Sequence, residues 1–367
     1  MRYLRFPEGK DRAVTLSYDD GCRSDIRFSR EIGRYGLRAT FNLNSGLIAE
    51  QPGEWRLTEE EIREYLLRPG HEIAVHGEYH RSTGALRPLE GIREVLGCRL
   101  SLEQRFGGLV RGMAYPNAGI TQLSEGVTYP EIRQYLRELG IVYARTLGGD
   151  NDRFELPNDW LAWMPTAHQE NPRLFDWIRP PRLFFLWGHS FELEKNGGWA
   201  RLDRIGEQLG GCEDTWYATN MEIYTYVTAY RELVLSADGH TVYNPSLQPV
   251  WLCFSSSNEC PHKKNRRGGF LHGVCRAVLP DGVRRYQRSS RARASRAERE
   301  VSSSAERTVT TVSAHVRFLQ PSSRERMALA AVGAQLPFSI RATVRFWKLR
   351  SVSRWRKSCM QGKISAL

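Results

Sequence analysis

Residues 15–21 read TLSYDDG and place two adjacent carboxylates, Asp19 and Asp20, directly after an apolar segment that begins at residue 13. The segment 13–19 is predicted to form a buried strand. Two neighbouring acids at the end of such a strand repel each other, and they are costly to leave unpaired near a core. One interpretation is a polar turn closed by Gly21; the other is a divalent metal bound by one of the two acids.

Similar apolar segments recur through the first 235 residues, at 39–44, 72–76, 109–115, 141–147, 160–164 and 183–188. Amphipathic segments with helical spacing separate them, at 25–35, 58–67, 89–106, 130–139, 202–209 and 221–233. Strands that alternate with helices indicate an α/β fold with a parallel sheet wrapped by helices. Seven such strands in under 200 residues favour a closed or nearly closed barrel over an open sheet.

Histidines follow two of the other predicted strands. His76 and His80 are four residues apart, so both imidazoles can reach one metal ion. One carboxylate and two histidines leave coordination positions open, as catalytic zinc sites require. His71 precedes its strand, and we expect it to pack structurally.

Two further residues are candidates for catalysis. His189 ends the last predicted strand, where it is either a hydrogen-bonded core histidine or a proton donor to a leaving group. Arg111 lies inside the segment 109–115, and burying it requires a partner. We expect that partner to be Asp19, with a purely structural partner as the alternative. The loops after parallel strands share one mouth of a barrel, so these residues should converge there.

These segments resemble the polysaccharide deacetylases of carbohydrate esterase family 4, also described by the NodB homology domain. The resemblance rests on SYDDG at 17–21, GHEI at 70–73 with HGEYH at 76–80, Arg111 with Tyr115-Pro116, Asp159-Trp160 and His189. It covers residues 10–235 and implies a distorted (β/α) barrel of about seven parallel strands. It also implies metal-dependent hydrolysis of acetyl groups.

The resemblance further implies a role for each matching residue. Asp20, His76 and His80 would bind the metal, and Asp19 would be the catalytic base. Arg111 would orient Asp19, and the Tyr115 amide would donate a hydrogen bond to the oxyanion. His189 would be the acid, and Asp159 would orient His189. Gly77 departs from the pattern, since a serine or threonine that would brace the loop is usual there.

The net charge of +12 is unevenly distributed. Residues 254–367 hold 24 Lys and Arg against 6 Asp and Glu, whereas residues 1–253 hold 29 against 35. We therefore divide the chain into a barrel domain (1–235), the start of a β-rich appendage (236–253) and a basic Arg/Ser-rich tail (254–367). The tail has three interpretations: a disordered segment, a nucleic-acid-binding arm, or a shifted reading frame, which we favour.

No secretory signal and no apolar run of the roughly 20 residues that span a membrane is present, and the seven cysteines are scattered. We expect a cytoplasmic protein that binds neither membrane nor nucleic acid. The predicted function is removal of acetyl groups, N-acetyl rather than O-acetyl, from a carbohydrate substrate, with zinc as the metal and cobalt or manganese as alternatives. Rival hypotheses are a related barrel that hydrolyses other C–N bonds, such as those of cyclic amides, and a non-catalytic carbohydrate-binding protein.

Overall fold

The computed structural model describes residues 2–147, 156–177, 183–238, 241–254, 274–278 and 283–285. Its largest sheet has the strand order β6-β5-β4-β3-β2-β8-β7, in which every neighbouring pair is parallel; β9 also pairs with β2. The strands are β2 (Arg12–Asp19), β3 (Ala39–Leu43), β4 (Glu72–Val75), β5 (Gly112–Ala114), β6 (Tyr143–Arg145), β7 (Ala167–His168), β8 (Leu183–Gly188) and β9 (Thr215–Tyr217).

Residues 163–169 close this sheet on itself. At one end the Trp163 amide donates to the Ala144 carbonyl of β6 (2.9 Å), and at the other the Gln169 amide donates to the Trp187 carbonyl of β8 (2.8 Å). The segment that contains β7 thus pairs with β8 on one side and reaches the edge strand β6 on the other. The predicted α/β fold, a distorted barrel with seven parallel strands, is confirmed.

The strand predicted at 160–164 is wrong. Residues Trp160–Ala162 form a 3-10 helix (η5), because the Asp159 side chain accepts a hydrogen bond from the Leu161 amide (3.1 Å) and starts a turn. Strand pairing begins only at Trp163, and the seventh strand is β7, a few residues later. Local capping therefore overrides the apolar pattern of this segment.

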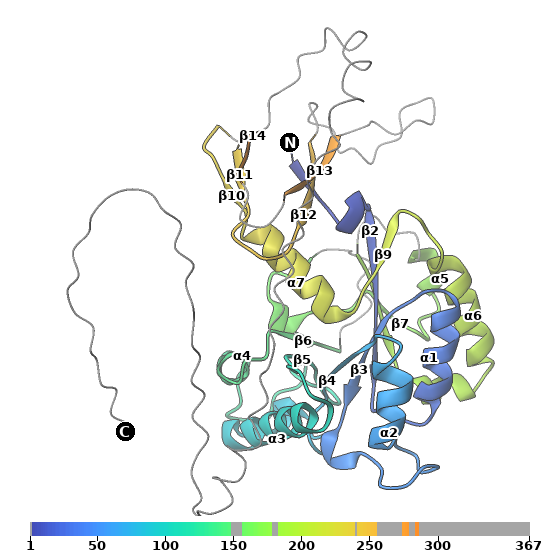
Figure 1. Cartoon of the computed structure of the whole chain (residues 1–367). Coiled ribbons are helices and arrows are strands. Elements are labelled where there is room, and N and C mark those ends of the chain that lie inside the picture. Colours follow the sequence, from blue (N-terminus) through green and yellow to red (C-terminus); the bar gives the residue numbers. More distant parts are fainter. Residues whose placement is uncertain are drawn as a thin grey trace, which may run out of the picture. The chain divides into compact units, whose positions relative to one another are not determined.

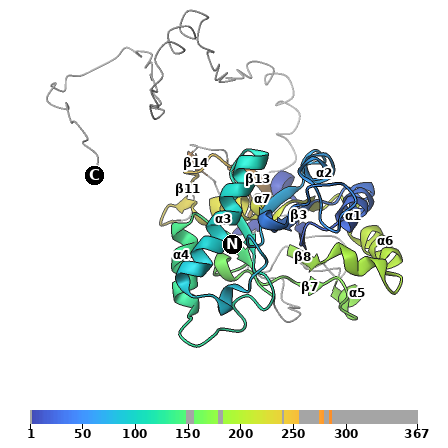
Figure 2. The same cartoon turned by 90° about the horizontal axis from the view of Figure 1, so that it is seen from below.

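Helices cover the outside of the barrel, with α1 and α6 on one side and α3 and α4 on the other (Figures 1 and 2). Their bounds are α1 (Ser24–Arg34), α2 (Glu59–Ile62), α3 (Pro88–Phe106), α4 (Tyr129–Glu138), α5 (Leu174–Trp177), α6 (Gly198–Leu209) and α7 (Asn220–Arg231). Short turns of 3-10 helix are η1 (Pro7–Gly9), η2 (Ser45–Leu47), η4 (Thr83–Ala85) and η6 (Ser190–Glu194), and a π-helical turn, η3 (Arg63–Leu67), continues α2. Thr58 forms a capping box with Glu61 at the start of α2.

The central strand β2 divides the core in two. Leu16 and Tyr18 belong to an apolar cluster with Phe28 of α1, whereas Ala13 belongs to a second cluster around Trp163. Successive side chains of a strand point to opposite faces. Asp19 therefore lies on the same face of β2 as Ala13, at the carboxyl end of the strand.

Two small antiparallel sheets stand beside the barrel in the strand orders β1-β12-β13 and β10-β11-β14. Their strands are β1 (Arg2–Arg5), β10 (Val234–Leu235), β11 (Thr241–Tyr243), β12 (Val250–Phe254), β13 (Val274–Val278) and β14 (Val283–Arg285). β13 and β14 fall within the basic tail, and the rest of that predicted tail after Phe254 lies outside the described residues. Among the described residues, no helix combines the length and apolarity that crossing a membrane requires.

Candidate active site

Polar side chains gather where the parallel strands of the barrel end. They are Asp19 and Asp20 at the end of β2, His76 and His80 after β4, Arg145 at the end of β6, His168 at the end of β7 and His189 after β8. This is the end at which the loops of parallel barrels carry functional groups. The contacts below show which of these side chains meet.

Asp19 is a buried, ionised carboxylate held by two donors. Its Oδ2 accepts a hydrogen bond from Arg145 Nη2, and its Oδ1 accepts one from Asn42 Nδ2 (2.8 Å). Burial raises the pKa of Asp19, but Arg145, His76 and His189 outweigh it and bring the pKa down to about 2. The carboxylate is therefore charged at neutral pH.

Asp20, His76 and His80 form a set of three ligand atoms that lie within 4.8 Å of one another. The Nε2 atom of His80 is 3.4 Å and that of His76 is 4.0 Å from Asp20 Oδ1. That oxygen is buried and has no hydrogen-bond partner among the described residues. A buried carboxylate oxygen without a donor is unfavourable, and a divalent cation between it and the two imidazoles would satisfy it. The three residues therefore fit a metal ion.

The backbone of two of these three residues is strained. Asp20 has a φ of 87° and His80 a φ of 60°, in the left-handed region that residues with a Cβ rarely adopt. Such strain persists where the surrounding structure fixes it, and it concentrates at functional sites. Here it turns the carboxylate and the imidazole toward each other.

His76 has the tautomer that a metal ligand needs. Its Nδ1 lies 2.9 Å from the Ala114 carbonyl oxygen, which can only accept, so Nδ1 carries the proton and Nε2 presents a lone pair to the acids. Burial lowers the pKa of His76 to about 4, although Asp19 and Asp20 oppose the shift. The imidazole is therefore neutral at pH 7, as metal ligation requires.

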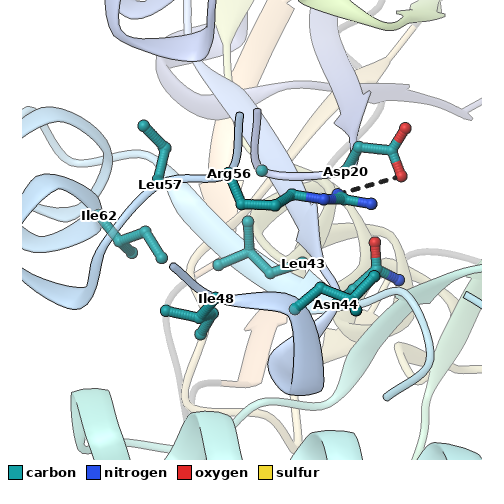
Figure 3. A pocket seen from close by; sticks show the side chains of 9 residues that line it. Asp20, Leu43, Asn44, Ile48, Arg56, Leu57 and Ile62 are labelled. Carbon is teal, nitrogen blue, oxygen red and sulfur yellow. Dashed lines mark ion pairs between the residues drawn. The ribbon is translucent and has the colours of Figure 1, made fainter. Parts of the chain in front are cut away.

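Arg56 contacts the same carboxylate. Its Nη1 forms an ion pair with Asp20 Oδ1 (3.3 Å), drawn in Figure 3. The guanidinium lies above the apolar floor formed by residues such as Leu43 and Ile48 (Figure 3). Asp20 thus faces a guanidinium as well as two imidazoles.

The loop between the two histidines is braced from helix α3. Glu94 Oε1 accepts hydrogen bonds from the amides of Tyr79 (2.7 Å) and Arg81 (3.2 Å), on either side of His80. Gly77 has a φ of 75°, and a Cβ there would meet Glu94 Oε1 at 3.1 Å. Glu94 therefore replaces the side-chain hydroxyl expected at Gly77, and glycine leaves room for it.

His189 also contacts Asp19. Its Nε2 is 3.9 Å from Asp19 Oδ2, and its Nδ1 is 3.1 Å from Glu192 Oε1. Burial alone would lower the pKa of His189, but the hydrogen bond to Glu192 and the charge of Asp19 outweigh it and raise the pKa. The imidazolium form needed by a general acid is thereby favoured.

The predicted pairing of Arg111 with Asp19 is wrong, and Arg145 forms it instead. Arg111 is exposed and its Nε donates to the Gly140 carbonyl (3.3 Å), because it precedes β5 and so lies at the amino end of the strand. Arg145 ends β6 and is fully buried against Asp19, with its guanidinium 4.5 Å from the Trp187 ring. Strand direction was the signal in the sequence: only an arginine at a carboxyl end can reach this mouth.

Two further predicted contacts are corrected. The Tyr115 amide already donates to the Arg145 carbonyl (3.0 Å) in the barrel ladder, so it is not a free oxyanion donor. Asp159 does not meet His189; it accepts from Tyr129 Oη (2.8 Å) and pairs with Arg133 (2.8 Å). The carboxylate that meets His189 is Glu192, three residues further along the chain.

Residues 7–144 match the family model described as "Polysaccharide deacetylase". No curated protein sequence matches the chain. Among solved structures, a putative polysaccharide deacetylase from Mycobacterium smegmatis is similar at 18% identity, over 62% of this chain and 94% of that one, with a TM-score of 0.45. A family 4 carbohydrate esterase from Streptomyces lividans in complex with acetate is similar at 16% identity, over 57% and 93%, with a TM-score of 0.40. A Streptococcus pyogenes deacetylase in complex with acetate is similar at 19% identity, with a TM-score of 0.32, over 36% of this chain and 54% of that chain, about half its length.

Proposed function

We propose that this protein, whose residues 7–144 match the polysaccharide deacetylase family model, is a metal-dependent deacetylase that hydrolyses the N-acetyl group of a carbohydrate. The observation that carries the proposal is the donor set of Asp20, His76 and His80 directly beside the ionised Asp19. A carboxylate with two imidazoles suits zinc, and cobalt or manganese can take the same ligands.

Asp19 is the group that takes a proton from the attacking water. Its Oδ2 faces both His76 Nε2 (3.8 Å) and His189 Nε2 (3.9 Å), so a water between the two imidazoles lies within its reach. With a pKa of about 2, however, this carboxylate is a weak base. A bound metal ion supplies the complementary chemistry, since it acidifies water and polarises the acetyl carbonyl.

His189 donates a proton to the leaving nitrogen. Hydrolysis of an amide releases an amine, which leaves only if it is protonated as the C–N bond breaks. His189 Nε2 and His76 Nε2 both lie within 4 Å of Asp19 Oδ2. Asp19 and His189 therefore offer a base and an acid at one site.

The hydrogen bonds that Arg145 and Asn42 donate to Asp19 are consistent with Asp19 as the base and His189 as the acid. Arg145 and Asn42 each donate to one oxygen of Asp19, which fixes the plane of the carboxylate and leaves one lone pair of each oxygen free. Neither donor can accept a proton. Asp19 and His189 are therefore the residues that exchange protons in the proposed mechanism.

Acetate release from a panel of N-acetylated and O-acetylated oligosaccharides tests the proposal. Asp19→Asn should lower the rate by about 10²- to 10⁴-fold while the metal stays bound, because the variant removes the base and leaves Asp20, His76 and His80 in place. Asp159→Asn is the matched control, since this acid lies outside the site and should leave the rate unchanged. Near-normal turnover by Asp19→Asn would remove that residue from the proposed role.

Metal content separates ligation from catalysis. His76→Ala should lose the metal in elemental analysis of the purified protein. His71→Ala, which removes a histidine bonded to Ser29 Oγ (3.1 Å), should keep it. Equal metal content in the two variants would contradict the assignment of His76.

A further inference from the structure

Glu192 bridges two histidines that stand on neighbouring strands. Its Oε1 is 3.1 Å from His189 Nδ1, and its Oε2 is 3.2 Å from His168 Nε2. Glu192 lies in η6, the 3-10 helix that directly follows His189, and is three residues after that histidine in the sequence. One carboxylate therefore holds the rings of the histidines at the ends of β7 and β8.

A buried amide fixes the orientation of this carboxylate. Gln169 Nε2 donates to Glu192 Oε2 and to the His189 carbonyl, both at 2.7 Å. Its Oε1 accepts from Tyr18 Oη (2.9 Å), which sets which end of the amide carries the hydrogens. Tyr18 and Gln169 are both fully buried, so the chain of contacts runs from the residue before Asp19 to Glu192 without exposed links.

The contact of Glu192 determines the tautomer of His189. A carboxylate accepts hydrogen bonds only, so His189 Nδ1 carries a proton and Nε2 is the atom that exchanges protons with the reaction. That atom is the one that faces Asp19 Oδ2. Burial would raise the pKa of Glu192, but the hydrogen bonds from His168 and His189 outweigh it and lower the pKa, so the bridge remains charged.

We propose that Glu192 is the positioning residue of the His189 acid, and that His168 and Gln169 hold Glu192 in turn. The inference rests on the proposed function, in which His189 Nε2 protonates the leaving nitrogen. Glu192 does not touch the reacting atoms; it acts by fixing the ring and the proton of His189. Glu192 thereby has the role that the sequence predicted for Asp159, that of orienting His189.

The same three side chains, His168, His189 and Glu192, also satisfy the distance requirement for a metal site. Their ligand atoms, however, already pair with one another, and Gln169 Nε2 donates to the same carboxylate. Hydrogen bonds among these three side chains, which we call the relay, explain their close approach without a metal ion. The metal content of the protein distinguishes the two.

Glu192→Gln tests the proposal with a change of one atom. A glutamine cannot accept from both histidines, so His189 loses its fixed orientation. We expect kcat for acetate release to fall about 10- to 100-fold with little change in KM, as for a partly misplaced general acid. Glu194→Gln is the matched control in the same 3-10 helix, where Glu194 binds Ser24 and Trp199 away from His189.

The pH dependence of kcat distinguishes a positioning role from a general loss of structure. A general loss of structure would lower kcat without shifting its pH dependence. The titratable groups around His189 are Asp19 of β2, Asp20 beyond it, His168 of β7 and Glu192 of η6. Only Glu192 changes in the variant, and removing its charge should move the alkaline limb of kcat to lower pH. An unshifted limb, or equal losses in Glu192→Gln and Glu194→Gln, would overturn the proposal.

Nuclear magnetic resonance separates this inference from the proposed function. In the unmodified protein the His189 ring should show a slowly exchanging Nδ1 proton, which Glu192→Gln should lose, whether or not acetate is released. Absence of that proton in the unmodified protein would refute the positioning role alone. More than one equivalent of metal per chain, with the second lost in Glu192→Gln, would replace the relay with a second metal site.

Discussion

Replacing Arg145 by methionine removes the cation that holds Asp19 ionised in the barrel interior. Arg145 is fully buried and Asp19 is 2% exposed, so no water can take over the hydrogen bond. Removing one partner of a buried ion pair typically costs about 3–5 kcal/mol, because the other charge is left uncompensated. Arg145→Met should therefore lower the free energy of unfolding by about this amount.

The pH dependence of stability should also change sign. In the native protein the pKa of Asp19 lies below its ordinary 3.8, at about 2, so ionised Asp19 stabilises the fold above pH 4 and this contribution disappears as the pH falls toward 2. The lowered pKa is worth about 2 kcal/mol. Without Arg145, we expect burial to outweigh His76 and His189 and to raise the pKa of Asp19 above its ordinary value, so that stability falls as the pH rises through 4.

Urea unfolding of metal-free protein at several pH values measures both effects. Arg111→Met is the matched control, because Arg111 is exposed and an exposed substitution changes stability by about 0.5 kcal/mol or less. The double variant Arg145→Met/Asp19→Asn should recover part of the loss, since no unpaired charge is left. A loss of under about 1 kcal/mol in Arg145→Met, or an equal loss in Arg111→Met, would refute the assignment of the ion pair.

Two other substitutions probe the surroundings of the site. Gly77→Ser should lower the free energy of unfolding by about 1–2 kcal/mol despite restoring the usual residue, because its φ of 75° and its contact with Glu94 both oppose a Cβ; thermal unfolding would show this, and an unchanged midpoint would contradict it. Burial raises the pKa of Asp25 to about 8 against the hydrogen bond from Ser190, so this group stabilises the fold most below pH 4 and loses that contribution as the pH rises to 8. Asp25→Asn should therefore gain stability relative to the native protein between pH 5 and pH 8 in urea titrations, and a difference that does not vary with pH would be evidence against a neutral Asp25.

The barrel and its mouth could be predicted because both follow from periodic patterns. Buried parallel strands give continuous apolar segments, and their direction brings the carboxyl ends together. That logic located Asp19, Asp20, His76, His80 and His189 from segments far apart in the sequence. Their close contacts then follow from strand order.

What could not be predicted depended on one-residue details of local geometry. Arg111 and Arg145 both lie in apolar segments, and only the boundary of each strand decides which end of the barrel an arginine occupies. Glu192 reaches His189 because η6 turns directly after β8, and no periodic pattern announces a 3-10 turn there. The Tyr115 amide donates to β6 within the sheet. Predicting this hydrogen bond requires knowing that β5 and β6 are neighbouring strands.

The most direct test of the account is acetate release by metal-free protein as zinc is added back. The account predicts no release from an N-acetylated oligosaccharide after chelation, and a rate that rises with zinc up to one equivalent per chain and then levels off. In His76→Ala the same addition should restore no activity. Acetate release that is independent of metal, or none at any occupancy on the whole substrate panel, would contradict the central claim that Asp20, His76 and His80 hold the metal of a deacetylase.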